Sequence, residues 1–222
     1  MRYCLLFVLL FFIKIQTSFS QSVVDWNVKM IVNAGHKKER ALKIKDQIKD
    51  ADLIILQEAF PKRIRKILST DFAYSVQPKK KFLKLNSGLL ILSKTPITSI
   101  KFYNFRNKKG IDRLCNKGAV RFTVDGIKYT ATHLQNHYPQ ITENQISELF
   151  VFANGSDVVV GDFNYEDPEY LKLIFDKNYE PTSATFENQI IDYVLTNKKI
   201  RSTVKQTDLS DHRPLYFFFT TM

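Results

Sequence analysis

The 222-residue sequence contains little cysteine, glycine or proline, with two, seven and seven residues respectively. Two cysteines are too few for a disulfide scaffold or for a zinc site built from cysteine. The low glycine and proline content excludes a collagen-like repeat and a long flexible linker. Hydrophobic residues make up 44% of the chain and aromatic residues 13%, which is typical of a packed globular protein. The length favours one domain over two.

Long hydrophobic runs are also scarce. The longest occupies residues 5–13, and its nine residues are too short for an ordinary transmembrane span. Arg2 precedes this run, and Ser18 and Ser20 place small residues before a plausible cleavage point. We therefore predict a secretory signal peptide over residues 1–20, a single domain over residues 21–222, and a secreted or periplasmic protein. The alternative is an uncleaved membrane anchor, which Lys14 argues against because it interrupts the apolar run.

Basic residues outnumber acidic ones by 33 to 22, and the excess is local. Residues 79–128 contain thirteen Lys and Arg side chains but only two acidic ones. A basic block of this kind favours a polyanionic partner, such as nucleic acid, an acidic membrane surface or a phosphate-bearing substrate. An ordinary solvated face explains the charge equally well, so charge alone leaves both interpretations open.

The hydrophobic periodicity alternates between helical and extended patterns. It predicts helices over residues 37–50, 142–152 and 168–175, the second opened by a capping box of Thr142 and Gln145. Apolar or β-branched runs predict strands over residues 22–32, 52–57, 87–93, 98–103, 120–124, 128–132, 157–160, 190–195 and 215–220. Helices interleaved with many strands, some of them joined as hairpins, predict an α/β sandwich of mixed sheets.

Polar side chains stand at the ends of several predicted strands. Because ligand sites in such sheets gather at strand ends, these side chains are expected to converge. Each one alone has an ordinary explanation as a cap or a surface residue, so the prediction rests on the whole set. The set consists of Asn27, Glu58, His133, Asp162, Asn164, Asp211 and His212.

The chemistry of this set points to phosphate esters. Its amide and carboxylate oxygens are ligands that a hard cation such as Mg²⁺ or Ca²⁺ takes. Its two histidines supply a general base and a donor to phosphate oxygens. A hard cation with histidines fits hydrolysis of a phosphate ester by in-line attack of water.

The chain resembles the endonuclease/exonuclease/phosphatase superfamily of metal-dependent phosphodiesterases. Seven segments match in the family's order and cover almost all of residues 21–222. They are WNV at 26–28, LQE at 56–58, SGLLILSKTPI at 87–97, THLQ at 132–135, GDFN at 161–164, IDYVL at 191–195 and SDHRPL at 210–215. The resemblance implies a four-layer sandwich of two mixed β-sheets flanked by helices.

The resemblance also implies a metal site. Glu58 with Asn27 would hold the catalytic Mg²⁺, and Asp211 would complete the site. Mn²⁺ and Ca²⁺ are the alternatives, and the sequence does not decide between one metal and two. Lewis-acid stabilisation of charge would be the main catalytic contribution of the metal.

The remaining roles that the resemblance implies concern proton transfer and the phosphate. His212 would be the general base, with Asp192 holding its imidazole in the right tautomer. Asp162 would orient the attacking water. Asn164 and His133 would stabilise charge on the phosphate oxygens.

One segment resembles the neutral sphingomyelinase branch of the superfamily. Asp112 and Lys117 stand five residues apart just before the strand that leads to the TH motif, as they do in that branch. The resemblance implies that Lys117 binds the substrate phosphate and that Asp112 controls its position. The alternative is a surface ion pair in a basic loop.

Three functions follow from these features. The first is a phospholipase C-type phosphodiesterase that cleaves a phosphosphingolipid at a membrane surface. The second is a secreted endonuclease of low sequence specificity, which the basic block favours. The third is a binding module on an inactive scaffold, which the complete set of site residues argues against. Nothing implies a stable protein partner, and we expect a monomer.

A membrane-docking hairpin is missing from its expected place. Bacterial sphingomyelinases of this branch carry a long aromatic-tipped hairpin between the IDYV and SDH motifs. Here eighteen residues separate Asp192 from Asp211, and none of them is Trp or Phe. We therefore consider two substitutes, residues 82–83 beside Lys79–Lys81 and residues 102–105 beside residues 106–109. Adjacent aromatic and basic residues suit contact with anionic lipid or with nucleic acid.

Overall fold

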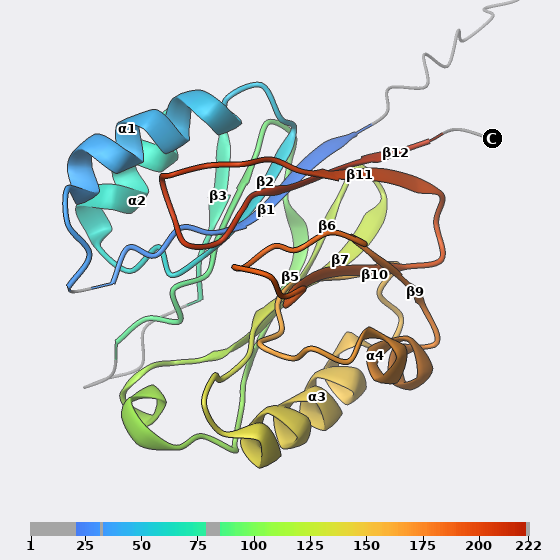
Figure 1. Cartoon of the computed structure of the whole chain (residues 1–222). Helices are drawn as coiled ribbons and strands as arrows, with labels where there is room; N and C mark the ends of the chain where they lie inside the picture. The colour runs from blue at the N-terminus through green and yellow to red at the C-terminus, as the bar shows by residue number, and fades with distance from the viewer. Residues whose placement is uncertain (1–20, 32, 79–84, 221–222) are drawn as a thin grey trace, which may run out of the picture.

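Two six-stranded mixed sheets pack face to face in a computed structural model that describes residues 21–31, 33–78 and 85–220 (Figure 1). The first sheet has the order β11 (Ile200–Val204), β12 (Leu215–Phe219), β1 (Ser22–Asn27), β2 (Leu53–Gln57), β4 (Leu90–Ser93), β3 (Tyr74–Val76). The second has the order β5 (Thr98–Asn104), β6 (Gly118–Val124), β7 (Ile127–His133), β8 (Val158–Asp162), β10 (Asp192–Thr196), β9 (Asn178–Glu180).

Helices cover the outer face of each sheet, which completes the predicted four-layer sandwich (Figure 1). The helices α1 (Lys37–Ile48) and α2 (Lys62–Leu68) lie on the first sheet. The helices α3 (Pro139–Ala153) and α4 (Pro168–Phe175) lie on the second. A short 3-10 turn, η1 (Gly110–Leu114), lies in the connection between β5 and β6.

The central strands are buried on both faces, which explains their continuous apolar sequences. Along β1, Val24 and Trp26 pack into the cluster that contains Ile44 of α1. Val23 points the other way, into the cluster between the two sheets that also contains Val160 of β8. Burial on both sides therefore fixes the register of these strands, because a slip by one residue would exchange the two faces.

The direction of the central strands positions the polar residues. The strands β1 and β2 are parallel, with Asn27 opposite Gln57, and β7 and β8 are parallel, with His133 opposite Asp162. Parallel neighbours end at the same edge of a sheet. The antiparallel strand β10 begins at that edge, where Asp192 pairs with Asp162. Both sheets thus bring their polar strand ends to one side of the sandwich.

The predicted capping box of Thr142 and Gln145 is wrong. The helix α3 begins three residues earlier, at Pro139, and both side chains are buried. Thr142 Oγ1 donates to the carbonyl of Gln135 at 2.7 Å, and Gln145 Oε1 accepts from the Gln135 backbone N–H at 2.8 Å. The two side chains therefore hold the loop that follows β7 instead of capping the helix.

Other differences from the predicted elements have local causes. The first strand ends at Asn27, not at residue 32, because Lys29 adopts a left-handed conformation with φ of 46°. Four short elements, α2, β3, β9 and β11, were not predicted from the sequence, since they are brief and partly exposed. The aromatic segment 102–105 is only partly a surface, because Phe105 is buried in the core under α3.

Two predicted features lie outside the described residues: the signal peptide at residues 1–20, and residues 82–83 with their neighbouring lysines. In the part of the chain that the structure describes, no helix has both the length and the hydropathy needed to cross a membrane.

Gly161 gives a test of this packing. Its φ is +139°, and a Cβ atom there would lie 2.1 Å from the carbonyl oxygen of Thr132 on β7. We expect Gly161→Ala to lower the free energy of unfolding by about 3 kcal/mol, measured by urea denaturation. Gly155→Ala is the matched control, because its φ of +79° is also positive but nothing lies within 4 Å; its cost should be about 1 kcal/mol. Equal losses in the two variants would contradict the proposed crowding.

Candidate active site

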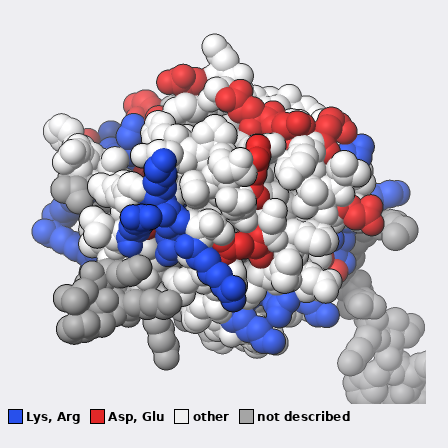
Figure 2. All heavy atoms as spheres, turned by 90° about the horizontal axis from the view of Figure 1, so that it is seen from below, with Lys and Arg blue, Asp and Glu red and all other residues white. Residues whose placement is uncertain are grey.

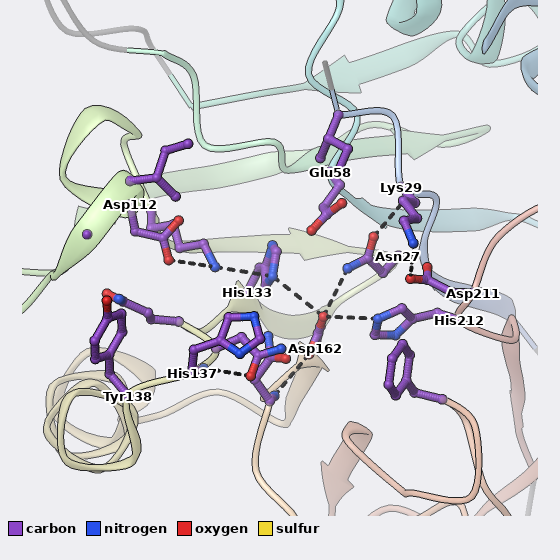
Figure 3. Close-up of a pocket in the computed structure, with 18 of the residues that line it drawn as sticks. Asn27, Lys29, Glu58, Asp112, His133, His137, Tyr138, Asp162, Asp211 and His212 are labelled. Carbon is purple, nitrogen blue, oxygen red and sulfur yellow. Dashed lines mark hydrogen bonds and ion pairs between the residues drawn. The ribbon is translucent and has the colours of Figure 1, made fainter. Parts of the chain in front are cut away.

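A pocket of about 750 Å³ opens at the edge where the polar strand ends meet (Figure 3). Nine of the ten predicted site residues line it, and the tenth, Asp192, contacts His212. The nine are Asn27, Glu58, Asp112, Lys117, His133, Asp162, Asn164, Asp211 and His212. The structure therefore brings together residues that are up to 185 positions apart in the sequence.

His212 is held in a fixed orientation from three sides. Its Nδ1 lies 2.9 Å from Asp192 Oδ2, and its backbone carbonyl accepts a hydrogen bond from Trp26 Nε1 at 2.9 Å. The ring of Phe186 packs against it with 4.8 Å between the centroids. Asp192 is itself fixed, because its backbone N–H donates to Thr185 Oγ1. This arrangement places the proton of a neutral His212 on Nδ1 and turns Nε2 toward Asp162, 3.8 Å away.

Electrostatics makes His212 strongly basic in the absence of a ligand. Burial disfavours the imidazolium, but the carboxylates of Asp192, Asp162 and Asp211 outweigh it and raise the pKa of His212 to about 10. Since this pKa is raised in the folded state, the interaction stabilises the fold below the ordinary histidine value of about 6.5. That stabilisation is lost as the pH rises through the raised pKa of about 10.

Asp162 connects the two sheets at the centre of the pocket. Its Oδ2 accepts from Asn27 Nδ2 at 3.0 Å, and its Oδ1 accepts from the Asn164 backbone N–H at 2.9 Å. The carboxylate is almost fully buried. Burial, followed by the charge of Asp192, raises the pKa of Asp162 to about 7.

Lys117 carries a buried positive charge on the opposite side. Its Nζ lies 3.2 Å from Asp112 Oδ2, donates to the Leu134 carbonyl at 2.9 Å, and lies 3.3 Å from His133 Nε2. The same His133 Nε2 lies 3.5 Å from Asp162 Oδ2, so this ring nitrogen stands between the ammonium of Lys117 and the carboxylate of Asp162. Burial, with Lys117 nearby, lowers the pKa of His133, so this imidazole is neutral. The predicted Asp112–Lys117 pair is thus a buried contact and not a surface ion pair.

Glu58 and Asn27 fit a hard divalent cation. Glu58 comes directly after β2 in a left-handed conformation, and its carboxylate points into the pocket toward Asn27 (Figure 3). Burial raises the pKa of Glu58, which means that this carboxylate gains from a nearby positive charge. Carboxylate and amide oxygens are the donors that Mg²⁺ prefers.

Asp211, the third predicted metal ligand, has a positively charged partner of its own. It lies at the rim of the pocket, where its Oδ2 contacts Lys29 Nζ at 2.6 Å. Its other oxygen, Oδ1, lies 3.3 Å from Ser210 Oγ. A second set, Asp162, Asp192 and His212, has ligand atoms within 4.8 Å of one another and could also hold a metal ion. In that set, however, His212 and Asp192 are already hydrogen-bonded to each other.

Several pocket residues were not predicted from the sequence. Lys29, His137, Tyr138 and Phe186 all line the pocket. Lys29 and His137 share the left-handed backbone conformation of Glu58 and Asn164, and such conformations gather at functional sites. For His137 and Tyr138, their closeness to the THLQ segment is the one sequence signal that could have identified them.

Comparisons with known proteins identify the family and the fold. A family model described as the Endonuclease/Exonuclease/phosphatase family matches residues 26–212. A curated relative, Sphingomyelinase C 2 of Leptospira interrogans, is 25% identical over an alignment that covers 84% of this chain. This chain spans 43% of the length of that relative.

Two solved structures share the fold. Beta toxin from Staphylococcus aureus with bound magnesium ions superposes with a TM-score of 0.72 at 19% identity, covering 91% of this chain and 100% of the other. TDP2 from D. rerio, complexed with a single-strand DNA product, superposes with a TM-score of 0.68 at 13% identity, covering 91% of this chain and 99% of the other.

The contact between Asp192 and His212 can be tested by titration. In Asp192→Asn, loss of the carboxylate charge should lower the pKa of His212 by about 1 to 3 pH units, measured by NMR on the imidazole protons. Asp176→Asn is the matched control, because Asp176 is exposed at the end of α4 with φ of 49°, which asparagine tolerates. An unchanged pKa of His212 in Asp192→Asn would contradict the assigned contact.

Proposed function

The chain belongs to the endonuclease/exonuclease/phosphatase family, and on this premise we propose that it is a metal-dependent phosphodiesterase that cleaves phosphosphingolipids of the sphingomyelin type. The observation that carries the proposal is the arrangement around one pocket of a buried His212–Asp192 pair and a buried cation, Lys117. The first can take a proton from water, and the second can bind the phosphate of a diester.

His212 serves as the general base in this proposal. Its Nε2 takes a proton from water while Asp192 holds the proton on Nδ1. The oxygen of that water forms a bond to phosphorus, and the bond from phosphorus to the ceramide oxygen breaks in line with it. The leaving oxygen takes up a proton, so the products are ceramide and a phosphorylated head group. Asp162 lies beside Nε2 and orients the water by accepting its second hydrogen bond.

The phosphate oxygens face donors on the other side of the pocket. Lys117 supplies a compact positive charge, and its contact with Asp112 sets its position. The side-chain amide of Asn164 donates to the Leu134 carbonyl at 3.0 Å, which places it beside Lys117. Together with His133, these groups would stabilise the negative charge that grows on the phosphate oxygens.

Glu58 and Asn27 would hold the metal, for which Mg²⁺ fits best, with Mn²⁺ or Ca²⁺ as alternatives. When bound, the cation would supply Lewis-acid stabilisation of the phosphate charge and would favour the neutral form of His212. Asp211, whose Oδ2 contacts Lys29, would be the third ligand. The Mg²⁺ seen in the S. aureus beta toxin structure supports the same choice of metal here.

Two observations favour the lipid substrate. The curated relative is a sphingomyelinase, and Lys117 lines the pocket in contact with Asp112. The second candidate is a nuclease of low sequence specificity. The basic block at residues 79–128 and the fold shared with a DNA-bound TDP2 structure favour that candidate.

We further propose that residues 1–20 are a signal peptide, that residues 21–222 form the catalytic domain, and that the protein is exported to the periplasm or the medium. The apolar run at residues 5–13 supports this proposal. We expect the mature protein to act as a monomer.

His212→Ala tests the activity. Removing the general base should lower the rate of phosphocholine release from sphingomyelin vesicles by at least about 100-fold. His36→Asn is the control, because His36 is exposed, lies outside the pocket, and has φ of 48°, which asparagine tolerates. The same preparations should be assayed on plasmid DNA. The wild type and His36→Asn could both fail to release phosphocholine but cleave DNA, with His212→Ala cleaving none. That result would replace the lipid substrate with nucleic acid.

Glu58→Gln tests the metal site. The variant keeps the shape of the side chain but removes its charge, so Mg²⁺ affinity measured by calorimetry should fall at least about tenfold. Chelation by EDTA should stop hydrolysis by the wild type, and added Mg²⁺ should restore it. Glu169→Gln is the control, since this residue of α4 is exposed and outside the pocket. Unchanged Mg²⁺ binding in Glu58→Gln would remove this residue from the metal site.

A further inference from the structure

Three exposed aliphatic side chains lie side by side near the mouth of the pocket. Ile111 is 76% exposed, Leu114 58% and Leu85 49%. Ile111 and Leu114 belong to the turn η1. Leu85 is joined to the end of that turn, because its N–H donates to the Leu114 carbonyl at 2.8 Å and its backbone pairs with Cys115. We name these three residues the aliphatic patch. Clustered exposure of this kind marks an interaction surface, whereas single exposed residues do not.

The turn that carries this patch is firmly anchored. At its start, the Lys109 N–H donates to Gln135 Oε1 and the Lys109 carbonyl accepts from Gln135 Nε2, both at 2.9 Å. In its middle, Asp112 turns inward to Lys117. Because these contacts fix the backbone of η1, the outward position of Ile111 and Leu114 is built into the fold.

Basic residues stand close to the patch along the chain. Arg106, Lys109 and Arg113 are exposed, and Lys108 is half-buried. The one acidic residue between positions 106 and 117 is Asp112, whose charge faces Lys117 inside the pocket. Figure 2 shows a stripe of basic side chains on the side of the underside where η1 lies, and the acidic side chains lie mainly above and to the right of it. This flank of the molecule is therefore both apolar and positively charged.

We propose that the aliphatic patch, with the basic residues close to it, docks the protein on an anionic lipid bilayer. Aliphatic side chains enter the acyl boundary of a bilayer, and lysine or arginine beside them is attracted to anionic headgroups. A nucleic-acid surface would instead present aromatic side chains for base stacking. The aromatic ring next to η1, that of Tyr138, lies 5.0 Å from Lys109 Nζ and lines the pocket, whereas the patch itself is aliphatic. Because Gly110 and Ile111 also line the pocket, docking here turns the pocket mouth toward the bilayer.

This docking role rests on the proposed lipid phosphodiesterase activity. It gives the protein a membrane contact in place of the missing aromatic hairpin. The region between β10 and the SDH segment contains only the short strand β11 and no aromatic hairpin. Docking through η1 would position the membrane at the Lys117 side of the pocket, where the phosphate is proposed to bind.

Vesicle binding without substrate gives the first test. Leu85→Ser/Leu114→Ser should lower co-sedimentation with vesicles of phosphatidylcholine and phosphatidylglycerol at least about tenfold relative to wild type. Neither residue lines the pocket. The matched control is Val151→Ser/Leu173→Ser, since these residues of α3 and α4 are 73% and 78% exposed but lie outside the patch. Both double variants should keep the wild-type far-ultraviolet circular dichroism and melting temperature.

Turnover on two substrates then separates docking from catalysis. The Leu85→Ser/Leu114→Ser variant should lose hydrolysis of sphingomyelin in anionic vesicles but keep wild-type hydrolysis of the soluble diester bis(p-nitrophenyl) phosphate. Equal vesicle binding by this variant and the wild type would overturn the docking surface. The docking surface would also be overturned if this variant lost binding to plasmid DNA but kept its binding to vesicles. Patch-dependent vesicle binding by a wild type that cleaves no sphingomyelin would support the docking surface and overturn the proposed substrate instead.

Discussion

The hydrogen bond from Asn27 Nδ2 to Asp162 Oδ2, 3.0 Å long, is the contact on which the site depends. It joins the last residue of β1 in one sheet to the last residue of β8 in the other. Each strand has a parallel neighbour, so Glu58 follows β2 and His133 ends β7 at the same edge. The apolar layer between the two sheets sets the distance between them, and in this way it also brings their strand ends together around one pocket.

Buried charge is the second constraint on this region. Asp25, Asp162 and Asp192 lie close enough that burial and their mutual repulsion raise the pKa of Asp25 and Asp162. Gln57 Nε2 donates to Asp25 at 2.7 Å, which gives this buried carboxyl one polar partner. The negative charge of Asp192 and Asp162 attracts the imidazolium of His212 and makes this side chain strongly basic, so the pocket favours positive charge. A hard cation at Glu58 and Asn27 would relieve the same repulsion, so metal binding and stabilisation of the native site are expected to be coupled.

The turn η1 links the chemistry to the surface. One side of this five-residue segment points Asp112 at Lys117, and the other exposes Ile111 and Leu114. The aromatic hairpin expected of a bacterial sphingomyelinase is absent from the stretch before the SDH segment, and we propose that η1 contacts the membrane in its place. A docking surface next to the phosphate-binding lysine would orient the substrate as it binds.

Local sequence pattern was sufficient to predict the sandwich and to name most of the residues that line its pocket. Apolar runs such as those of β2 and β8 are buried on both faces, and the motifs at their ends bring Glu58 and Asp162 to one edge, so local pattern sufficed there. It misplaced the start of α3, because Thr142 and Gln145 bond to a loop that only the folded chain brings near. Three features could be seen only in the folded protein. They are the contact of Asp211 with Lys29, the burial of Phe105 in the core, and the pairing that brings Leu85 to Ile111 and Leu114. Such contacts depend on how distant segments meet, and residue spacing along the chain carries no record of that geometry.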